Sequence, residues 1–190
     1  MSSGEFDFAL AIGGAAGQGI ATPGNILARI VVRRGLHLYA YNAYQSIIRG
    51  GHIFLTIRIG DQEVENHGDK LDMLLCLNQD TMNRHLRLMG PGSRVIFNSD
   101  DVKPGDANEG VELCPMPVKK LTDNHRNKLI QNTVALGTSL YLLGLDFQIL
   151  EEALTLQFQR KGQTVVDENV GVARAGFDHA SANFEPFPEA

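Results

Sequence analysis

Cysteine is scarce in this sequence. Among 190 residues there are two, Cys76 and Cys114, and they form no CxxC pair. Each lies among apolar neighbours, which is typical of a buried free thiol in a reducing compartment, so no disulfide framework is expected. Iron–sulfur clusters are held by several cysteine thiolates, so these two residues cannot form a complete ligand set.

Long hydrophobic runs and basic clusters are also missing. No apolar run approaches the roughly 20 residues that a membrane-spanning helix needs, and the first residues have neither the basic nor the apolar region of a secretory signal. The net charge is −5, and basic residues group only in pairs such as Arg33 and Arg34. We therefore expect a cytoplasmic protein that binds neither membranes nor nucleic acid.

Several catalytic patterns are absent. The six histidines, at positions 37, 52, 67, 85, 125 and 179, show no spacing typical of metal ligands. The sequence contains no G-x-S-x-G elbow and no glycine-rich loop followed by Gly-Lys-Ser/Thr. We expect no metal site in this chain, and no catalytic residue.

The remaining composition is that of a globular domain. Apolar residues make up 43% of the chain and charged residues 21%, which is enough apolar material for one core. We expect a single domain over residues 1–183. Residues 184–190 (FEPFPEA) are rich in proline and are expected to form a tail or linker.

Periodicity predicts strands that alternate with helices. The expected strands cover residues 6–12, 36–41, 52–59, 62–66, 71–77, 94–98 and 111–114. The first helix ends near Gly35, and its start is open between Gln18 and Thr22, which Pro23 follows. Neighbouring strands without a helix between them favour a mixed sheet, because parallel pairs need a long crossover.

The C-terminal third is predicted to be helical. One helix runs from residue 126 to Gly144, and Leu136 and Leu143 lie outside its apolar stripe, which indicates burial on more than one side. Asp146 is expected to cap the next helix, and Thr164 the last. The fold class is therefore predicted to be α/β: three-layer α/β/α, with a mixed, mostly parallel sheet and a helical C-terminal third.

A glycine-rich segment follows the first predicted strand. It reads Gly13-Gly14-Ala15-Ala16-Gly17-Gln18-Gly19. Glycine lets the backbone turn sharply and can leave amide groups facing an anion at a helix N-terminus. The spacing differs from G-x-G-x-x-G, and the second strand ends without the acidic residue that holds a ribose. A tight turn alone and a loop that contacts an anion or cofactor both stay open.

A second segment, residues 44–52 (YQSIIRGGH), is polar and aromatic and lies between two predicted strands. Arg49 offers a fork of donors that matches a carboxylate or a phosphate. Gly50 and Gly51 would let a ligand or partner approach the backbone. From chemistry alone, a surface loop with a solvated arginine is the preferred interpretation.

Together the two segments resemble the γ-type domain of the 2-oxoacid:ferredoxin oxidoreductases, which include pyruvate, 2-oxoglutarate and 2-oxoisovalerate enzymes. Residues 71–78 (LDMLLCLN), 132–137 (NTVALG) and 169–173 (NVGVA) extend the resemblance over most of the chain. It is nearest to the form fused at the N-terminus of the α subunit. Gln45, where glycine or proline is common, leaves a free γ subunit open.

The resemblance implies oxidative decarboxylation of a 2-oxoacid, with coenzyme A as acyl acceptor and ferredoxin as electron acceptor. Thiamine diphosphate and Fe–S clusters belong to other parts of such a complex, so this domain alone is expected to bind no cofactor and to be inactive. Its expected partners are the α and β parts, and the isolated domain could form a homodimer. The expected substrate or coenzyme A contacts are Tyr44, Ser46, Arg49, Gly50, Gly51 and His52. The expected anion or interface loop comprises Gly13, Gly14, Gly17, Gln18 and Gly19.

Two other functions are compatible with the residues. A stand-alone nucleotide-binding α/β protein would be stabilised by NAD(H), FAD or ATP. A purely structural assembly domain would present a large apolar patch and respond to no ligand.

Overall fold

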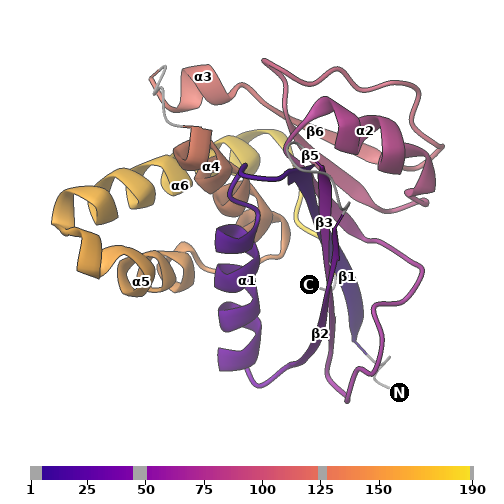
Figure 1. Cartoon of the computed structure of the whole chain (residues 1–190), viewed down its shortest axis with the longest axis horizontal. Coiled ribbons are helices and arrows are strands. Elements are labelled where there is room, and N and C mark those ends of the chain that lie inside the picture. The colour runs from indigo at the N-terminus through magenta and orange to yellow at the C-terminus, as the bar shows by residue number, and fades with distance from the viewer. Residues whose placement is uncertain (1–5, 45–50, 124–127, 189–190) are drawn as a thin grey trace.

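The computed structural model describes residues 6–44, 51–123 and 128–188, without the side chains of residues 44 and 128–131 (Figure 1). The strands are β1 (Asp7–Ala15), β2 (His37–Tyr44), β3 (His52–Gly60), β4 (Met73–Cys76), β5 (Arg94–Asn98) and β6 (Glu112–Met116). The helices are α1 (Ala21–Arg33), α2 (Gln79–His85), α3 (Val118–Leu121), α4 (Lys128–Leu142), α5 (Phe147–Phe158) and α6 (Gln163–Asn183), with 3-10 turns η1 (Leu86–Leu88) and η2 (Gln159–Lys161).

The strands form one six-stranded sheet in the order β2-β3-β1-β4-β5-β6. β1, β4, β5 and β6 are parallel to one another, whereas β3 is antiparallel to both β1 and β2. The predicted mixed, mostly parallel sheet is thus confirmed. After β1 the chain continues to β2 and β3, which lie on one side of β1. It then crosses to β4 on the other side of β1, so the strand order reverses between β1 and β4.

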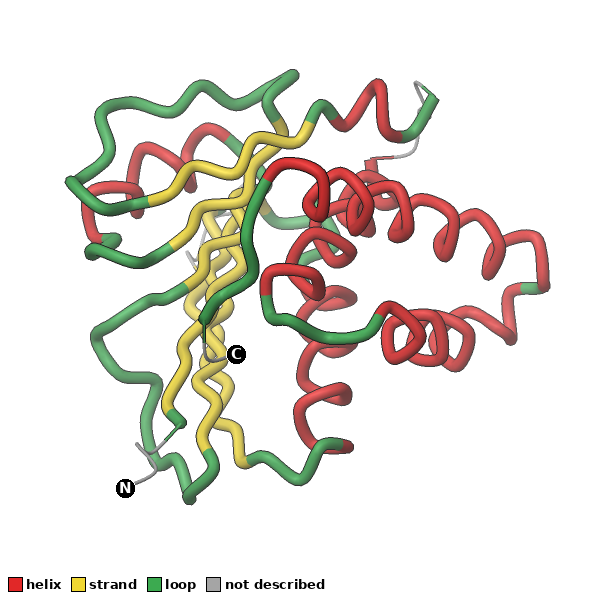
Figure 2. Tube along the Cα trace, turned by 180° about the vertical axis from the view of Figure 1, so that it is seen from behind, coloured by secondary structure: helices red, strands yellow, loops and turns green. Residues whose placement is uncertain are grey.

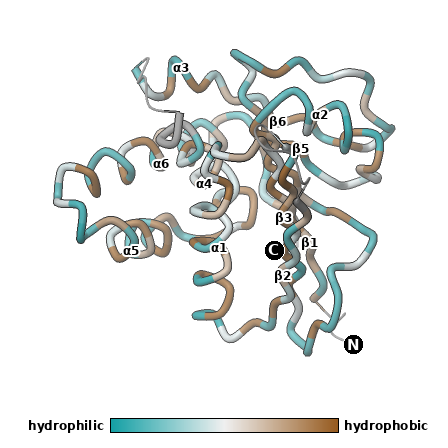
Figure 3. The backbone as a smooth tube through the Cα atoms, viewed as in Figure 1, coloured by the Kyte–Doolittle hydropathy of each residue, from teal (hydrophilic) through white to brown (hydrophobic). Residues whose placement is uncertain are grey.

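The sheet lies between two layers of helix. Side chains of a strand alternate between its faces, and Leu10 and Ile12 pack with α1, α4, α5 and α6. Ala11 belongs to a second apolar cluster on the other face, with Met82 of α2. Figures 1 and 2 show α2 on one side of the sheet and the longer helices on the other, which confirms the three-layer α/β/α prediction. Hydrophobic residues concentrate in the central strands, while the segment between β3 and β4 is largely hydrophilic (Figure 3).

The helical C-terminal third is confirmed. Leu136 of α4 is 1% exposed, and Leu143, which directly follows α4, is 7% exposed, so both are buried as predicted. Gly137 lies directly against the backbone of α6, where an added Cβ would collide with the carbonyl oxygen of Ala173. α4 and α6 therefore pack backbone to backbone.

Three local predictions meet different outcomes. Asp146 caps α5, because its carboxylate accepts a hydrogen bond of 2.8 Å from the amide of Gln148. Thr164 is not the cap of α6: Gly162, with φ of 103°, precedes a helix that begins two residues earlier than predicted. Residues 62–66 form no strand, since Asn66 is drawn into a hydrogen bond with Arg58 instead of a sheet ladder.

Residues 184–188 pack on the sheet. The Phe187 ring meets Phe8 edge to face at 5.1 Å, and its amide donates to the carbonyl of Leu142 at 2.7 Å. The Arg94 guanidinium lies 4.3 Å from the centre of the Phe187 ring and donates to the carbonyl of Glu185. A role for residues 184–190 as a linker stays a prediction.

The helices within the described ranges include none whose length and hydropathy suffice to cross a membrane.

Candidate functional site

The glycine-rich segment lies at the carboxyl end of β1. Gly13 and Gly14 belong to the strand, contrary to the prediction that the strand stops before them, because Gly13 pairs with Phe54 of β3 and with Cys76 of β4. The turn itself comprises residues 16–20, and α1 begins at Ala21, so neither predicted start of this helix is correct. Gly17 and Gly19 have φ of 87° and 77°, in the left-handed region that glycine adopts without strain.

Close packing explains the glycine at position 13. A Cβ there would collide with the methyl group of Thr81 in α2 and would lie 2.9 Å from the Thr81 hydroxyl. Glycine thus lets α2 approach the end of β1. The strand half of the segment therefore has a packing role, and the turn around Gly17 and Gly19 is the part left to contact a ligand.

The second predicted segment meets the first at this edge. The amide of Ala16 donates to the carbonyl of Gly51 at 3.0 Å, and Ala15 pairs with His52 at the start of β3. Tyr44 is the last residue of β2, and its side chain is not described. Ser46, Arg49 and Gly50 lie outside the described residues, so their predicted contacts stay predictions.

A pair of histidines, His52 and His85, lies at the same edge. Nothing in the sequence indicates that these two residues are neighbours. The Nε2 atoms of His52 and His85 are 2.9 Å apart, and the rings are nearly coplanar, with 22° between them. His85 also stacks on Phe54, with 3.8 Å between ring centres. Asp80 lies 3.6 Å from Nδ1 of His52 and accepts a hydrogen bond from Arg84 at 2.8 Å. The two imidazoles can share one proton between their Nε2 atoms, and the Asp80 carboxylate lies beside the far side of the His52 ring.

Both imidazoles are held toward the neutral form. Burial lowers the pKa of His85 to about 4, helped by His52 and Arg84 and opposed by Asp80. Burial also lowers the pKa of His52, while Asp80 opposes the shift and Arg84 adds to it. A neutral ring carries one donor and one acceptor, so the pair can form an N–H···N hydrogen bond near neutral pH.

Gln18 connects this edge to two further elements. Its side-chain oxygen accepts hydrogen bonds from the Ala15 amide at 2.5 Å and from the side-chain amide of Asn78 at 3.0 Å. Its backbone carbonyl accepts one from the side chain of Asn132 in α4. The predicted loop residue is thus tied into the fold on several sides.

A groove of about 440 Å³ opens on the β3 side of the turn. Its walls are the first two turns of α1 and the β2–β3 pair, and its lining includes Gly17, Gly19, Asn25, Asn42, Ile53 and Leu55. The floor is apolar, whereas Asn25 and Asn42 add carboxamides that both donate and accept hydrogen bonds. Such a groove suits a slender, mainly apolar chain that carries a few polar groups.

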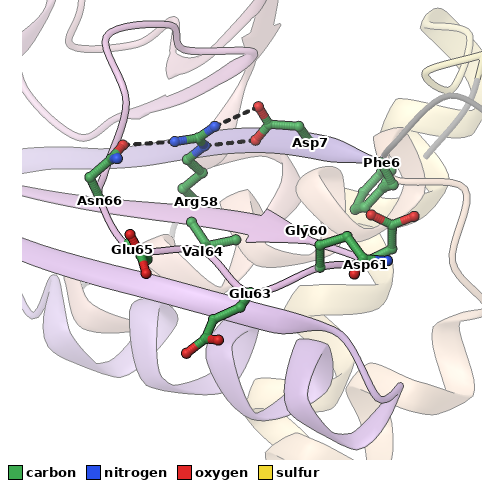
Figure 4. Close-up of a pocket in the computed structure, with 10 residues that line it drawn as sticks. Phe6, Asp7, Arg58, Gly60, Asp61, Glu63, Val64, Glu65 and Asn66 are labelled. Carbon is green, nitrogen blue, oxygen red and sulfur yellow. Dashed lines mark hydrogen bonds and ion pairs between the residues drawn. The ribbon is translucent and has the colours of Figure 1, made fainter.

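A second cavity, of about 270 Å³, lies at the opposite end of the β1–β3 pair. Arg58 donates to both carboxylate oxygens of Asp7, at 2.7 and 2.8 Å, and to Asn66 at 2.7 Å (Figure 4). The Arg58 hydrogen bond is the main cause that lowers the pKa of Asp7. The Arg58 guanidinium thus already donates to Asp7 and Asn66, so it is not available to bind a ligand in this cavity.

Metal ligands do not gather at either end. In the three described ranges, no group of three or more histidine, cysteine, aspartate or glutamate side chains is placed to hold a metal ion. Cys76 and Cys114 are buried free thiols, as predicted. Burial raises the pKa of both to about 12, so both stay protonated near neutral pH.

The topology also differs from that of a dinucleotide-binding unit. In a Rossmann βαβ unit the second strand lies beside the first. Here β3 separates β2 from β1. This difference adds to the glycine spacing as an argument against a stand-alone dinucleotide site.

A family model described as pyruvate ferredoxin/flavodoxin oxidoreductase matches residues 9–179. The chain belongs to this family. The predicted resemblance to the 2-oxoacid:ferredoxin oxidoreductases is thereby confirmed.

Two of the curated relatives in this oxidoreductase family are much longer than the chain. Ketoisovalerate oxidoreductase subunit VorA of Methanothermobacter thermautotrophicus is 28% identical over 92% of this chain and 36% of its own length. The 2-oxoacid:ferredoxin oxidoreductase subunit alpha of a Sulfolobus species is 36% identical over 78% of this chain and 30% of its own length. The chain thus spans about a third of the length of these relatives.

Solved structures of the family share the fold. The 2-oxoglutarate:ferredoxin oxidoreductase from Magnetococcus marinus, with 2-oxoglutarate, coenzyme A and succinyl-CoA bound, superposes with a TM-score of 0.87 at 25% identity, over 96% of this chain and 32% of that one. The gamma subunit of a keto/oxoacid ferredoxin oxidoreductase from Geobacter sulfurreducens superposes with a TM-score of 0.75 at 23% identity, over 92% of this chain and 99% of that one.

Proposed function

We propose that this chain is the γ-type part of a 2-oxoacid:ferredoxin oxidoreductase, an enzyme that decarboxylates a 2-oxoacid oxidatively and forms an acyl-CoA. Its role is to shape the mouth of the active site and an interface with the α and β parts. The observation that carries the proposal is the junction of the two sequence segments, where Ala16 binds the carbonyl of Gly51 beside an open groove. Membership of the family supports it.

The redox cofactors of such an enzyme do not fit this chain. An iron–sulfur cluster needs thiolate ligands, commonly four, whereas the chain has two cysteines, both buried and protonated. The two thiols also belong to apolar clusters on opposite faces of the sheet. Fe–S clusters therefore belong, in this proposal, to other parts of the complex. The family resemblance implies the same for thiamine diphosphate, so the chain alone is proposed to be inactive.

Coenzyme A is the ligand that best matches the groove. Its pantetheine arm is a slender chain with two amide groups, which suits an apolar floor flanked by Asn25 and Asn42. The Magnetococcus marinus relative was solved with coenzyme A bound, which supports this choice. The work of this chain would be to orient the acyl acceptor, because positioning of reactants can supply much of a rate enhancement.

Ser46 and Arg49 are proposed to hold the 2-oxoacid carboxylate or the coenzyme A phosphates. Arg49 lies in the segment that joins the end of β2 to the start of β3, and β3 starts beside the glycine turn. Ferredoxin would meet the complex rather than this chain. Self-association of the isolated domain and a cytoplasmic location are parts of the same proposal.

The test uses the complete enzyme that contains this chain. Replacing Arg49→Met should raise KM for the 2-oxoacid or for coenzyme A by about tenfold or more, as expected for a lost charge-assisted hydrogen bond. Arg58→Met, at the opposite end of the sheet, is the matched control and should leave both KM values unchanged. Unchanged KM values in Arg49→Met would return residues 44–52 to a structural role, as in a purely structural assembly domain.

A further inference from the structure

Gln18 joins the glycine turn to three other elements. Its Oε1 accepts from the amide of Ala15 at the end of β1 and from Nδ2 of Asn78, which lies between β4 and α2. Its backbone carbonyl accepts from Asn132 of α4. The turn is thus held from the strand, from the α2 side and from the helical layer.

The orientation of Asn78 is fixed independently of Gln18. Asn78 is the N-cap of α2, and its Oδ1 accepts hydrogen bonds of 2.8 Å from both the amide and the hydroxyl of Thr81. Because the oxygen must face the end of the helix, Nδ2 must face Gln18. Gln18 therefore acts at this contact as an acceptor, with the same atom that receives the Ala15 amide.

The bridge spans the place where open α/β sheets usually bind ligands. Ligands in such folds lie in the crevice where the strand order reverses, outside the carboxyl ends of the strands. In this sheet the order reverses between β1 and β4. The contact between Gln18 and Asn78 crosses that crevice, so the protein's own carboxamides occupy it.

The other side of the turn is open. Gly17 and Gly19 line the groove between α1 and the β2–β3 pair, and a Cβ added at Gly17 would meet no atom within 4 Å. A ligand that approaches the turn is thus directed to this side. The backbone there keeps its left-handed conformation while Gln18 holds the turn from behind.

We propose that Gln18 is a positioning residue that closes the crevice between β1 and β4 and presents the backbone of Gly17 and Gly19 to coenzyme A in the groove. The inference rests on the proposed function, since it needs an acyl acceptor at this turn. Gln18 itself touches no reacting atom; it acts through the conformation of the turn.

The two hydrogen bonds to Oε1 provide a sharp pair of variants. Gln18→Glu keeps an oxygen acceptor for both donors, and a carboxylate is also favoured near the N-terminus of α1. Gln18→Leu has a similar size but no acceptor, so it leaves the Ala15 amide and Nδ2 of Asn78 without this partner. If Gln18 only filled space, Gln18→Glu would be impaired at least as much as Gln18→Leu.

The experiment measures kcat and the two KM values in the complete enzyme. For Gln18→Leu we expect KM for coenzyme A to rise by about tenfold, the equivalent of one to two neutral hydrogen bonds. KM for the 2-oxoacid and kcat should change by less than about threefold. Gln18→Glu should restore KM for coenzyme A to within about threefold of the original enzyme. Thermal melting of both variants shows whether each is folded.

If Gln18→Leu does not fold, Asn78→Asp serves instead, because an aspartate keeps the helix cap and replaces the donor to Gln18 by a carboxylate oxygen, which repels Oε1. It should raise KM for coenzyme A in the same way. The inference is overturned if the folded variant keeps the KM for coenzyme A of the original enzyme, or if Gln18→Glu is as impaired as Gln18→Leu. Failure of the proposed function is a separate result: the unmodified enzyme would then show no 2-oxoacid oxidation that depends on coenzyme A.

Discussion

The two ends of the β1–β3 pair are built by different means. At the end where Ala15 pairs with His52, neutral side-chain amides, backbone hydrogen bonds and close glycine contacts hold the chain. At the end where Asp7 pairs with Gly60, an ion pair of Arg58 and Asp7 joins β1 to β3, with side chains 27% and 52% exposed. The first end leaves backbone groups beside a groove, whereas the second uses its strong arginine donor internally.

This difference predicts how the stability of each end responds to substitution and to salt. Close packing and buried hydrogen bonds lose stability when a single atom is added or removed. A partly exposed ion pair contributes little and is screened by salt. The end proposed to bind coenzyme A should therefore respond strongly to substitution, and the opposite end should respond mainly to salt.

The largest effect is expected from Gly13→Ala. The added Cβ collides with Thr81, and overpacking of this kind costs about 1–3 kcal/mol of unfolding free energy. Urea denaturation of the purified chain measures it. Combining the change with Thr81→Ser removes the obstructing methyl group and should recover part of the loss. If the Gly13→Ala variant were as stable as the original chain, Thr81 of α2 would not pack as closely against Gly13 as the structure indicates.

A smaller effect is expected from Asn78→Ala. It removes the N-cap of α2 and the donor to Gln18, and loss of a cap alone costs about 1 kcal/mol. Asn78→Asp keeps the cap and should lose less than half as much in the same denaturation experiment. Equal losses in the two variants would mean that the contact with Gln18, and not the cap, dominates.

The histidine pair should make the first end sensitive to pH. The pKa of His85 falls from 6.5 in the unfolded chain to about 4 in the folded one, so the folded state binds fewer protons. The contribution is fully present above the unfolded value and is lost as the pH falls toward about 4. Between about pH 7 and pH 5 the loss should be about 1 kcal/mol, because partial exposure screens the shift.

Replacing His85→Gln should flatten this pH dependence, whereas His37→Gln, at an exposed position of β2, should leave it in place. Denaturation curves at several pH values give the slope, and histidine NMR titration follows the ring directly. A slope unchanged by His85→Gln would assign the pH dependence to other groups.

The smallest effect is expected from Arg58→Met at the opposite end. Its loss of melting temperature at low salt should be below that of each variant above, since the ion pair that it breaks is partly exposed. Near about 1 M salt, where the Debye length is about 3 Å, the difference from the original chain should become smaller. A large loss of melting temperature that persists in high salt would show that Arg58 contributes to stability by more than a screened ion pair.

The sequence predicts most of the fold because its signals are local. Apolar runs such as residues 71–77 and the alternation in residues 52–59 reflect burial that neighbouring residues share, and their strands are confirmed as β4 and β3. The strand predicted at residues 62–66 is wrong, and Asn66 of this segment accepts a hydrogen bond from Arg58 of β3 outside any sheet ladder. That contact is visible only in three dimensions.

The sequence predicts the candidate site in part. The glycine pattern and residues 44–52 pointed to two loops, and the described parts of both meet at one edge of the sheet. His85 and Asp80 were missed because they lie on α2, and His85 reaches His52 from 33 positions along the chain only on folding. In the sequence, Asn78 stands out only as part of the family-like segment 71–78, although a polar residue directly before a helix is a signal for a cap.

Hydrogen–deuterium exchange of the complete enzyme, with and without coenzyme A, tests the difference between the two ends most directly. We predict that coenzyme A slows exchange of the amides of residues 16–20 and of Ile53, which border the groove, and leaves the amides of residues 58–66 unchanged. Unchanged exchange at residues 16–20, or protection confined to residues 58–66, would contradict the account.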